Sequence, residues 1–389
     1  MYAPASTLRL IVRNAGRHKL RTTLTLLGLV VAIFSFGLLQ TVIDAWYAGA
    51  EGASNTTLVT RNKTSLVFPL PLSYQARIRA VDGVTGVGFA NWFQGTYKDP
   101  KNFFAQFAIS GASYLDIYPD YLLTPEERSN FLHDRKGAIV GRKLADQYGF
   151  KVGDTIPLKG TIYPGNWEFV LRGIYDGKES TTNTATMFFH WDYVNESLKV
   201  TAPRRANQIG VYVVQINHPE NAAAISAAVD HEFANSLAET LTETEKAFQL
   251  GFVSMSEAIV AAIRVVSFVV IVIIAAVMAN TMAMSARERL GEYATLKALG
   301  FGPGFLALMI VGESLLLAVV GALTGIVLLF PFAKWLGGVM GTMFPVFQVS
   351  HSTVWQQLAA ALVIGLAAAI APTIRAVRVN IVEGLRSIG

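Results

Sequence analysis

Hydrophobic positions gather into four long windows of the chain, while polar positions are spaced as in a soluble protein elsewhere. At about 1.5 Å of rise per residue, each window is long enough as a helix to cross a hydrocarbon core of roughly 30 Å. The pattern therefore predicts four transmembrane helices. They are Thr22–Ile43, Val265–Ala286, Phe305–Phe332 and Val354–Ile374.

The first window could be mistaken for a secretory signal peptide. Its apolar run is longer than the core of a signal peptide, it begins about twenty residues into the chain, and no convincing small-residue cleavage site follows it. We therefore expect an uncleaved membrane helix.

The segment between the first two windows has the pattern of a soluble α/β domain. Runs rich in β-branched and aromatic residues alternate with turn signals such as Gly153–Asp154 and Pro164–Gly165. Helices are expected at Arg142–Tyr148, which Gly149 ends, and from Pro219 to about Leu237. The expected strands are Thr56–Thr60, Phe103–Ser110, Trp167–Tyr175 and Ile209–Ile216.

From Thr242 to Met284 the sequence predicts one unbroken helix, because this stretch has no proline and a single glycine, Gly251. Such a helix would leave the membrane and enter the soluble domain without a break, so it could carry a rigid-body movement between them. The alternative is a flexible hinge at Gly251.

Composition agrees with a membrane protein that has a sizeable soluble part. Hydrophobic residues make up 52% of the chain and charged residues 15%, against about 25% charged residues in a soluble domain. The formal net charge is +5. There is no cysteine, which excludes disulfides and thiolate metal sites.

Lys and Arg are concentrated in short flanks of the windows, where they set orientation. The N-terminal tail, the segment after the second window and the C-terminal tail are rich in them, whereas the loop between windows three and four offers only Lys334. Both termini are therefore expected in the cytoplasm. Because topology accounts for the basic residues, nucleic-acid binding loses its support.

The predicted fold is membrane α-helical, with four transmembrane helices and a large α/β extracytoplasmic domain inserted between helices 1 and 2. The expected parts are a cytoplasmic amphipathic N-terminal helix (1–21), transmembrane helix 1 (22–45), the extracytoplasmic domain (46–252), a stalk with transmembrane helix 2 (253–286), a cytoplasmic helix (287–303), transmembrane helix 3 (304–334), a short external loop (335–353), transmembrane helix 4 (354–374) and a cytoplasmic tail (375–389).

Motifs for catalysis or metal binding are scarce. His190, Asp192 and Glu196 stand at offsets of two and four, which do not place all three on one face of a strand or a helix, so we expect a solvated surface cluster. Nucleophile-elbow, HExxH and phosphate-loop motifs do not occur in the sequence. We expect no catalytic residue, no metal site and no cofactor in this chain.

The segment SARERLGEYATLKALGFGP, between windows two and three, predicts a short amphipathic helix. Arg289 and Glu292 are i,i+3 partners, and Gly300 stands where a left-handed residue would end the helix before Pro303. A helix of this kind is suited to bind a partner protein, and we call it a handle. The alternative is a connecting loop whose arginines only enforce topology. The apolar stripe is formed by Leu290, Tyr293, Ala294, Leu296 and Leu299.

Three features of the membrane part suggest further roles. Glu313, the only charge inside a window, is expected to bond a neighbouring helix or to reach the interface, with proton or substrate handling as the alternative. Gly321 and Gly325 form a G-x-x-x-G spacing for close helix packing, within one copy or between two copies. Arg9, Arg13 and Arg17 repeat every four residues and predict a basic helix on the membrane surface.

The stretch RERLGEYATLKALGFGP closely resembles the coupling segment of the MacB/FtsX-like permeases of ABC transporters, a family that includes macrolide exporters and lipoprotein-release permeases. LRLIVRNAGRHKLRTTLTLLGLVVA, AIVGRKLADQYGFKVGDTIPL, FVLRGIYDG and APTIRAVRVNIVEGLR are similar to other parts of the family, so the resemblance covers nearly the whole chain. By this resemblance the ATPase-coupling residues are Arg287, Glu288, Arg289, Glu292, Tyr293, Leu296, Lys297 and Gly300.

The resemblance implies a permease subunit in a bacterial cytoplasmic (inner) membrane. Two permease copies, identical or different, would bind two copies of a cytoplasmic ATPase that holds ATP and Mg²⁺. By mechanotransmission, movement would pass through the spans to the outside domain for export or extraction of a substrate, as in efflux or lipoprotein release. A periplasmic adaptor or membrane-fusion protein is a further partner that the family suggests.

One other function stays open: the chain could be a signalling scaffold that activates a cell-wall hydrolase and transports nothing. An autonomous carrier would show inverted repeats and polar broken helices, which four spans with one charge do not supply. If the segment grips an ATPase, Glu288→Lys or Leu296→Asp is expected to weaken ATPase binding and to uncouple ATP hydrolysis.

Overall fold

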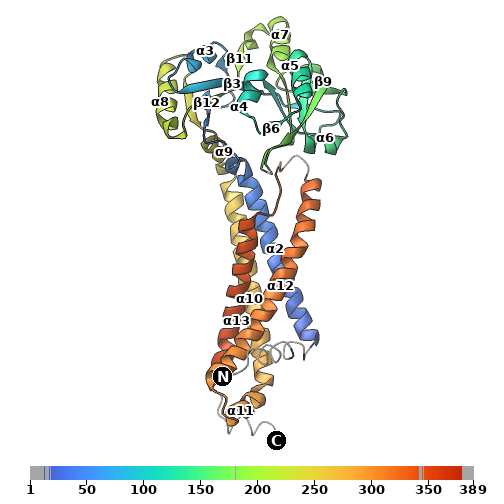
Figure 1. Cartoon of the computed structure of the whole chain (residues 1–389), viewed down its shortest axis with the longest axis vertical. Coiled ribbons are helices and arrows are strands. Elements are labelled where there is room, and N and C mark those ends of the chain that lie inside the picture. Colours follow the sequence, from blue (N-terminus) through green and yellow to red (C-terminus); the bar gives the residue numbers. More distant parts are fainter. Residues whose placement is uncertain are drawn as a thin grey trace. The chain divides into compact units, whose positions relative to one another are not determined.

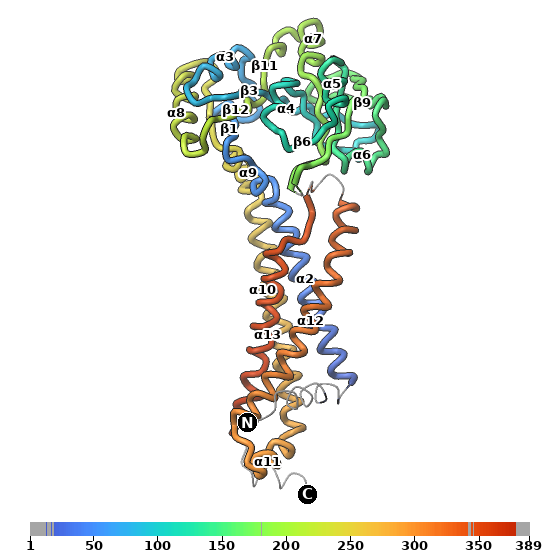
Figure 2. Tube along the Cα trace, viewed as in Figure 1, coloured from blue at the N-terminus to red at the C-terminus, as the bar shows by residue number. Residues whose placement is uncertain are grey.

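The computed structural model describes residues 13, 17, 19–179, 181–340, 344 and 346–378, which form two compact units. The helix unit comprises the chain up to Asp44, Glu257–Gly338 and the chain from Phe347 onward. The α/β unit comprises Ala45–Ser256 with Val339–Val346. Figures 1 and 2 trace the chain in sequence colours.

The helix unit is built from four long helices, each long and apolar enough to cross a membrane. This confirms the four predicted transmembrane helices and the insertion of an α/β domain between the first two. A fifth, short helix lies between the second and third (Figure 1). They are α2 (Lys19–Glu51), α10 (Glu257–Glu288), α11 (Leu290–Ala298), α12 (Pro303–Val339) and α13 (His351–Arg378).

One apolar core joins the four long helices. It includes Ile33 of α2, Met278 of α10, Ala318 of α12 and Ile364 of α13, all almost fully buried. Large apolar side chains on the outer faces stay exposed, as expected for helices that face lipid.

Polar contacts fix α2 against α13. Asp44 accepts hydrogen bonds from the hydroxyls of Ser350 (2.6 Å) and Thr353 (2.7 Å) at the start of α13. The buried Gln357 amide donates to the Ile33 carbonyl at 2.8 Å. In an apolar surrounding such polar groups need hydrogen-bond partners, and here the partners of α2 lie on α13 and those of α13 lie on α2.

A mixed eleven-stranded sheet forms the centre of the α/β unit, in the order β13-β1-β12-β3-β5-β10-β7-β9-β8-β4, with β6 paired to β9. The pairs β10–β5 and β7–β9 are parallel and the other pairs are antiparallel. Two further strands, β2 (Leu70–Pro71) and β11 (Gln208–Ile209), pair separately. The sheet strands are β1 (Thr57–Asn62), β3 (Val84–Trp92), β4 (Gly95–Thr96), β5 (Ala105–Ile109), β6 (Tyr121–Leu122), β7 (Gly137–Gly141), β8 (Thr155–Gly160), β9 (Gly165–Gly177), β10 (Thr186–His190), β12 (Val211–Ile216) and β13 (Thr240–Thr244).

Side chains alternate between two cores on opposite faces of this sheet, as the period of a strand requires. On β10, Met187 and Phe189 join the larger core, whereas Phe188 joins the smaller one. The larger core is covered by α3 (Tyr74–Arg79), α6 (Arg142–Tyr148), α7 (Trp191–Thr201) and α8 (Ala222–Glu232), and the smaller one by α4 (Ala112–Ile117) and α5 (Pro125–His133).

The structure confirms the four predicted strands as β1, β5, β9 and β12, with ends shifted by a few residues, and α6 with both of its ends. The expected helix from Pro219 to Leu237 is shorter than predicted. A 3₁₀ turn, η2 (Pro219–Asn221), precedes α8, and the chain turns after Glu232.

The prediction of one unbroken helix from Thr242 to Met284 is wrong. Thr240–Thr244 is strand β13, because the buried hydroxyls of Thr240 and Thr242 bond Asp230 and the strand pairs with β1. Helix α9 (Glu245–Ser254) follows, and a turn at 255–256 separates it from α10. Gly251 lies inside α9, so the hinge proposed there is wrong as well. The turn coincides with the boundary between the two units.

Candidate functional site

The segment predicted as a handle is two elements rather than one helix. Helix α10 continues to Glu288, Arg289 interrupts it with φ −104° and ψ 10°, and α11 begins at Leu290. Arg287 and Glu288 therefore belong to the last turn of the second long helix. The interruption lets α11 take a different direction from α10.

The predicted C-terminal end of this helix is confirmed. Gly300 has φ +90°, its N–H donates to the Lys297 carbonyl at 3.0 Å, and the Phe301 N–H donates to the Leu296 carbonyl at 3.0 Å. These two bonds form a Schellman motif, which glycine favours because it has no Cβ to clash in the left-handed conformation.

The apolar stripe of α11 packs on the ends of the long helices of the same chain. Tyr293 and Ala294 are buried in the core of the helix unit, and Leu290 and Leu296 pack against it. Leu299 is different, with 71% of its surface exposed. The chain's own helices therefore cover Tyr293, whereas Leu296 is half-buried, and the assignment of both residues to ATPase coupling stays a prediction.

Arg289 forms a buried ion pair with Glu313 of α12, its Nη1 lying 2.8 Å from Oε2. The two residues are only 5% and 8% exposed. The predicted i,i+3 contact with Glu292 is longer, at 3.9 Å from Nε. Arg289 thus anchors the start of α11 to the third long helix and is too buried for a partner to reach. Glu313 bonds a neighbouring element, as expected.

Burial and charge act in opposite directions at this anchor. Burial alone would lower the pKa of Arg289, but Glu313, together with Tyr293 and Glu292, outweighs this and raises that pKa above its ordinary value. Burial raises the pKa of the Tyr293 phenol, and the neighbouring Arg289 guanidinium offsets part of the rise. The guanidinium therefore keeps its charge, and the phenol stays neutral.

The two glutamates of the segment pair with basic residues near the start of α2. Glu288 accepts from Arg21 at 2.7 Å, and Glu292 pairs with Arg17. Arg13 is exposed, and Arg9 lies outside the described residues, so the predicted basic membrane-surface helix falls largely outside them. Arg17 and Arg21 instead help to hold α10 and α11 beside the first long helix.

Lys297 also has a partner within the chain. Its Nζ donates to the Val377 carbonyl at 2.6 Å, in the last turn of α13. A cation is favoured there because the last carbonyls of a helix carry partial negative charge. Contacts from α11 and the preceding Arg289 thus reach Arg17, which lies just before α2, as well as α12 and α13.

The surface that remains accessible is narrower than the predicted one. Glu288 and Ala298 are exposed, and so are five further residues that we call the open face: Arg287, Glu292, Thr295, Leu299 and Gly300. Leu299 was predicted as part of the apolar stripe, whereas Thr295 was not predicted. The spacing of four between Thr295 and Leu299 places them on one side of a helix, which is the signal that could have identified Thr295.

Gly321 and Gly325 of α12 pack on α2 of the same chain. A Cβ on Gly321 would lie 2.8 Å from the Leu29 Cβ, and one on Gly325 would lie 3.0 Å from the Val30 carbonyl oxygen. The structure therefore assigns this G-x-x-x-G pair to packing within one copy.

The His190 cluster of the α/β unit is not brought together. His190 stacks on Phe131 and its Nε2 lies 2.7 Å from the Phe131 carbonyl oxygen, while Glu196 pairs with Lys199. Within residues 19–179, 181–340 and 346–378, no group of three or more His, Cys, Asp or Glu side chains could hold a metal ion.

Comparison with protein families identifies the chain. The MacB-like periplasmic core domain matches residues 22–232, more than half of the chain, and the FtsX-like permease C-terminal domain matches residues 264–381. The chain belongs to the MacB/FtsX-like family of ABC transporter permeases. The second match contains the whole of α11 and the open face. The chain is thus a multi-pass membrane protein of a transporter-permease family, and its membership implies a cytoplasmic ATPase partner.

Two solved structures are similar to parts of this permease. One is the extracellular domain of the noncanonic ABC-type transporter YknZ from Gram-positive bacteria, with 14% identity and a TM-score of 0.35 over 48% of this chain and 100% of the other. Another is a domain of a protein described as a permease from Porphyromonas gingivalis, with 13% identity and a TM-score of 0.32 over 48% and 88%. No curated protein matches the chain.

Exchanging the charges of Arg21 and Glu288 tests whether Glu288 acts within the permease. Glu288→Lys is expected to lower the melting temperature slightly, because it places two cations together, and a partly exposed pair contributes about 0–1 kcal/mol. The exchange Arg21→Glu with Glu288→Arg should restore both the melting temperature and ATPase binding. If binding stays weak in the exchange variant although stability recovers, Glu288 contacts the ATPase directly.

Proposed function

We propose that this permease passes ATP-driven movement from a cytoplasmic ATPase, through its four spans, to its extracytoplasmic α/β unit, where a substrate is exported or extracted. In this proposal two permease copies act together in a bacterial inner membrane, and both termini are cytoplasmic. ATP and Mg²⁺ are held by the ATPase. The basic flanks of the spans support this orientation.

The observation that carries the proposal is the attachment of α11. Its buried side is held by the Arg289–Glu313 pair, by the Lys297 contact to α13 and by apolar packing, while the residues of the open face are exposed. A helix tied to several spans cannot move without them. Force applied to the open face would therefore reach the spans, which is what a coupling element requires.

The test replaces residues of the open face. Leu299→Asp places a charge on an apolar side chain that is 71% exposed, so the fold should be kept while the contact is lost. We expect ATPase co-purification to fall on the order of tenfold or more, together with permease-stimulated ATP hydrolysis in nanodiscs, because the new carboxylate would be buried at an apolar contact without a partner.

Val200→Asp is the matched control. Val200 is 83% exposed in α7 of the α/β unit and should tolerate the same change without effect on the ATPase. Leu296→Asp is a poorer probe, because Leu296 packs on the core and its loss would undock α11. Normal ATPase binding and stimulation by Leu299→Asp together with Arg287→Glu would contradict the proposal.

A further inference from the structure

A large cavity lies within the α/β unit, on the sheet face of the smaller core. Its volume is about 1260 Å³, against roughly 300–1,000 Å³ for common ligand pockets. Strands β1, β3, β5, β10 and β12 contribute its floor, and α9 and the residues of α2 from Ala45 onward contribute walls. It has room for a ligand larger than most drug-sized molecules.

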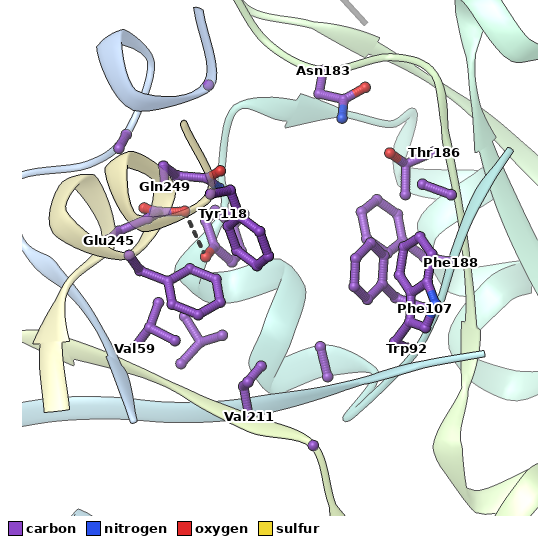
Figure 3. A pocket seen from close by; sticks show the side chains of 18 of the residues that line it. Val59, Trp92, Phe107, Tyr118, Asn183, Thr186, Phe188, Val211, Glu245 and Gln249 are labelled. Carbon is purple, nitrogen blue, oxygen red and sulfur yellow. Dashed lines mark hydrogen bonds between the residues drawn. The ribbon is translucent and has the colours of Figure 1, made fainter. Parts of the chain in front are cut away.

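Aromatic rings cover one side of the cavity. Trp92 and Phe107 meet edge to face with ring centres 5.0 Å apart, and Phe107 stacks with Phe188 at 6.2 Å. Figure 3 shows these three side chains together on one side of the pocket. Trp92 is 38% exposed, so its ring is accessible to a ligand. Such a surface favours an apolar body, above all a flat or ring-shaped one.

A carboxylate occupies the opposite side. Glu245, the first residue of α9, accepts a hydrogen bond from the Tyr118 hydroxyl at 2.9 Å (Figure 3). It also accepts one from the Ser54 N–H at 3.1 Å. A carboxylate has about four acceptor positions, so some remain for another donor. Burial raises the pKa of Glu245, and these two hydrogen bonds offset part of that rise.

No cation of the described residues pairs with this carboxylate. The other charged side chains lining the cavity are engaged elsewhere: Asp120 pairs with Lys178 at 3.5 Å, and the Arg205 guanidinium lies over the Tyr163 ring at 5.3 Å. Within residues 19–179, 181–340 and 346–378, Glu245 forms no ion pair, although a nearby cation would favour the charged form of this partly buried carboxylate.

An apolar loop borders the same cavity. Leu66 and Val67 line it and are 38% and 85% exposed, and the next residue, Phe68, is 53% exposed. Exposed apolar side chains beside a cavity are removed from water when an apolar ligand arrives.

We propose that this cavity binds an amphiphile that combines an apolar, ring-containing body with a protonated amine, the body lying on Trp92, Phe107 and Phe188 and the amine meeting Glu245. The charge-assisted contact and the aromatic surroundings both favour a cation at that end. The inference rests on the proposed function in taking this amphiphile as the molecule exported or extracted.

The test compares three probes that share a naphthyl ring and differ in their head group: naphthylethylamine, naphthylethanol and naphthylpropionate. Binding to the full-length permease in nanodiscs is measured by titration calorimetry, with empty nanodiscs as the blank and no ATPase present. The wild-type permease should bind the amine about tenfold more tightly than the alcohol, and the carboxylate most weakly, because one charge-assisted contact separates them.

Variants then assign the two ends of the site. Glu245→Gln, which keeps an acceptor for Tyr118 or Ser54, should bind the amine and the alcohol equally. Trp92→Ala should weaken both by a similar factor, and Glu220→Gln, an exposed control in η2, should behave as the wild type. Equal affinity for all three probes, no binding of any probe, or a preserved amine preference in Glu245→Gln would overturn the inference.

The order of the three probe affinities is measured on the wild-type permease. It therefore tests the inference even if a variant fails to fold. Because no ATPase is present, failure here leaves the proposed coupling role unaffected, and failure of ATPase binding at Leu299 leaves this site unaffected.

Discussion

Replacing Arg289 with alanine is expected to destabilise the permease by about 3–5 kcal/mol, because it leaves the Glu313 carboxylate buried without its cation. Glu313→Ala should be similarly costly, since the guanidinium is then unpaired. Thermal unfolding of the purified permease in nanodiscs measures the loss. ATP hydrolysis should also lose its coupling, because α11 is no longer anchored to α12.

A double variant serves as the control for this pair. Arg289→Met with Glu313→Leu replaces both charges by apolar side chains and should recover much of the lost stability, since apolar replacements of buried pairs are often well tolerated. If the double variant is stable yet uncoupled, the pair serves to transmit movement. If Arg289→Ala melts at the wild-type temperature, the buried pair does not anchor α11.

Enlarging Gly321 to leucine is expected to separate α12 from α2. A Cβ there already lies 2.8 Å from the Leu29 Cβ, so a larger side chain cannot fit without moving a helix. Overpacking commonly costs about 1–3 kcal/mol, and we expect a cost at the upper end here, visible as a lower melting temperature.

Gly338→Leu is the matched control, because it lies on the same helix with no atom within 4 Å of its would-be Cβ. It should melt as the wild type does. Equal melting temperatures for the Gly321 and Gly338 variants would contradict the assignment of the G-x-x-x-G pair to the contact with α2.

The sequence was sufficient wherever structure follows from local chemistry. The four spans follow from windows nearly free of charge, α6 from its ending at Gly149 with φ +70°, and the end of α11 from Gly300 with φ +90°. Helix α5 could also have been predicted, because Thr124 and Glu127 form a capping box.

The sequence was insufficient wherever a contact joins distant parts of the chain. Arg289, between α10 and α11, and Glu313, on α12, are 24 positions apart. A local pattern therefore indicates only the i,i+3 residue, Glu292, as the ion-pair partner of Arg289. For the same reason, a helical stripe predicts burial but not the surface that covers it. The cavity is built from strands paired out of sequence order, which no local pattern reveals.

The error at Thr240–Thr244 has a physical cause. The absence of proline permits a helix but does not require one, and β-branched threonines fit a strand equally well. Hydrogen bonds from Thr240 and Thr242 to Asp230, together with pairing to β1, stabilise the strand rather than a helix. The connection through α10 therefore passes a turn at 255–256, whereas helix α2 (Lys19–Glu51) continues unbroken across the other boundary between the units, at Asp44 and Ala45.

The coupling role is tested most directly by site-specific cross-linking, for which the chain is well suited because it contains no cysteine. A photo-reactive maleimide on Leu299→Cys is expected to capture the ATPase in membranes, whereas the same label on Val200→Cys, equally accessible in the α/β unit, should not. Capture of the ATPase from Val200 but not from Leu299 would contradict the account.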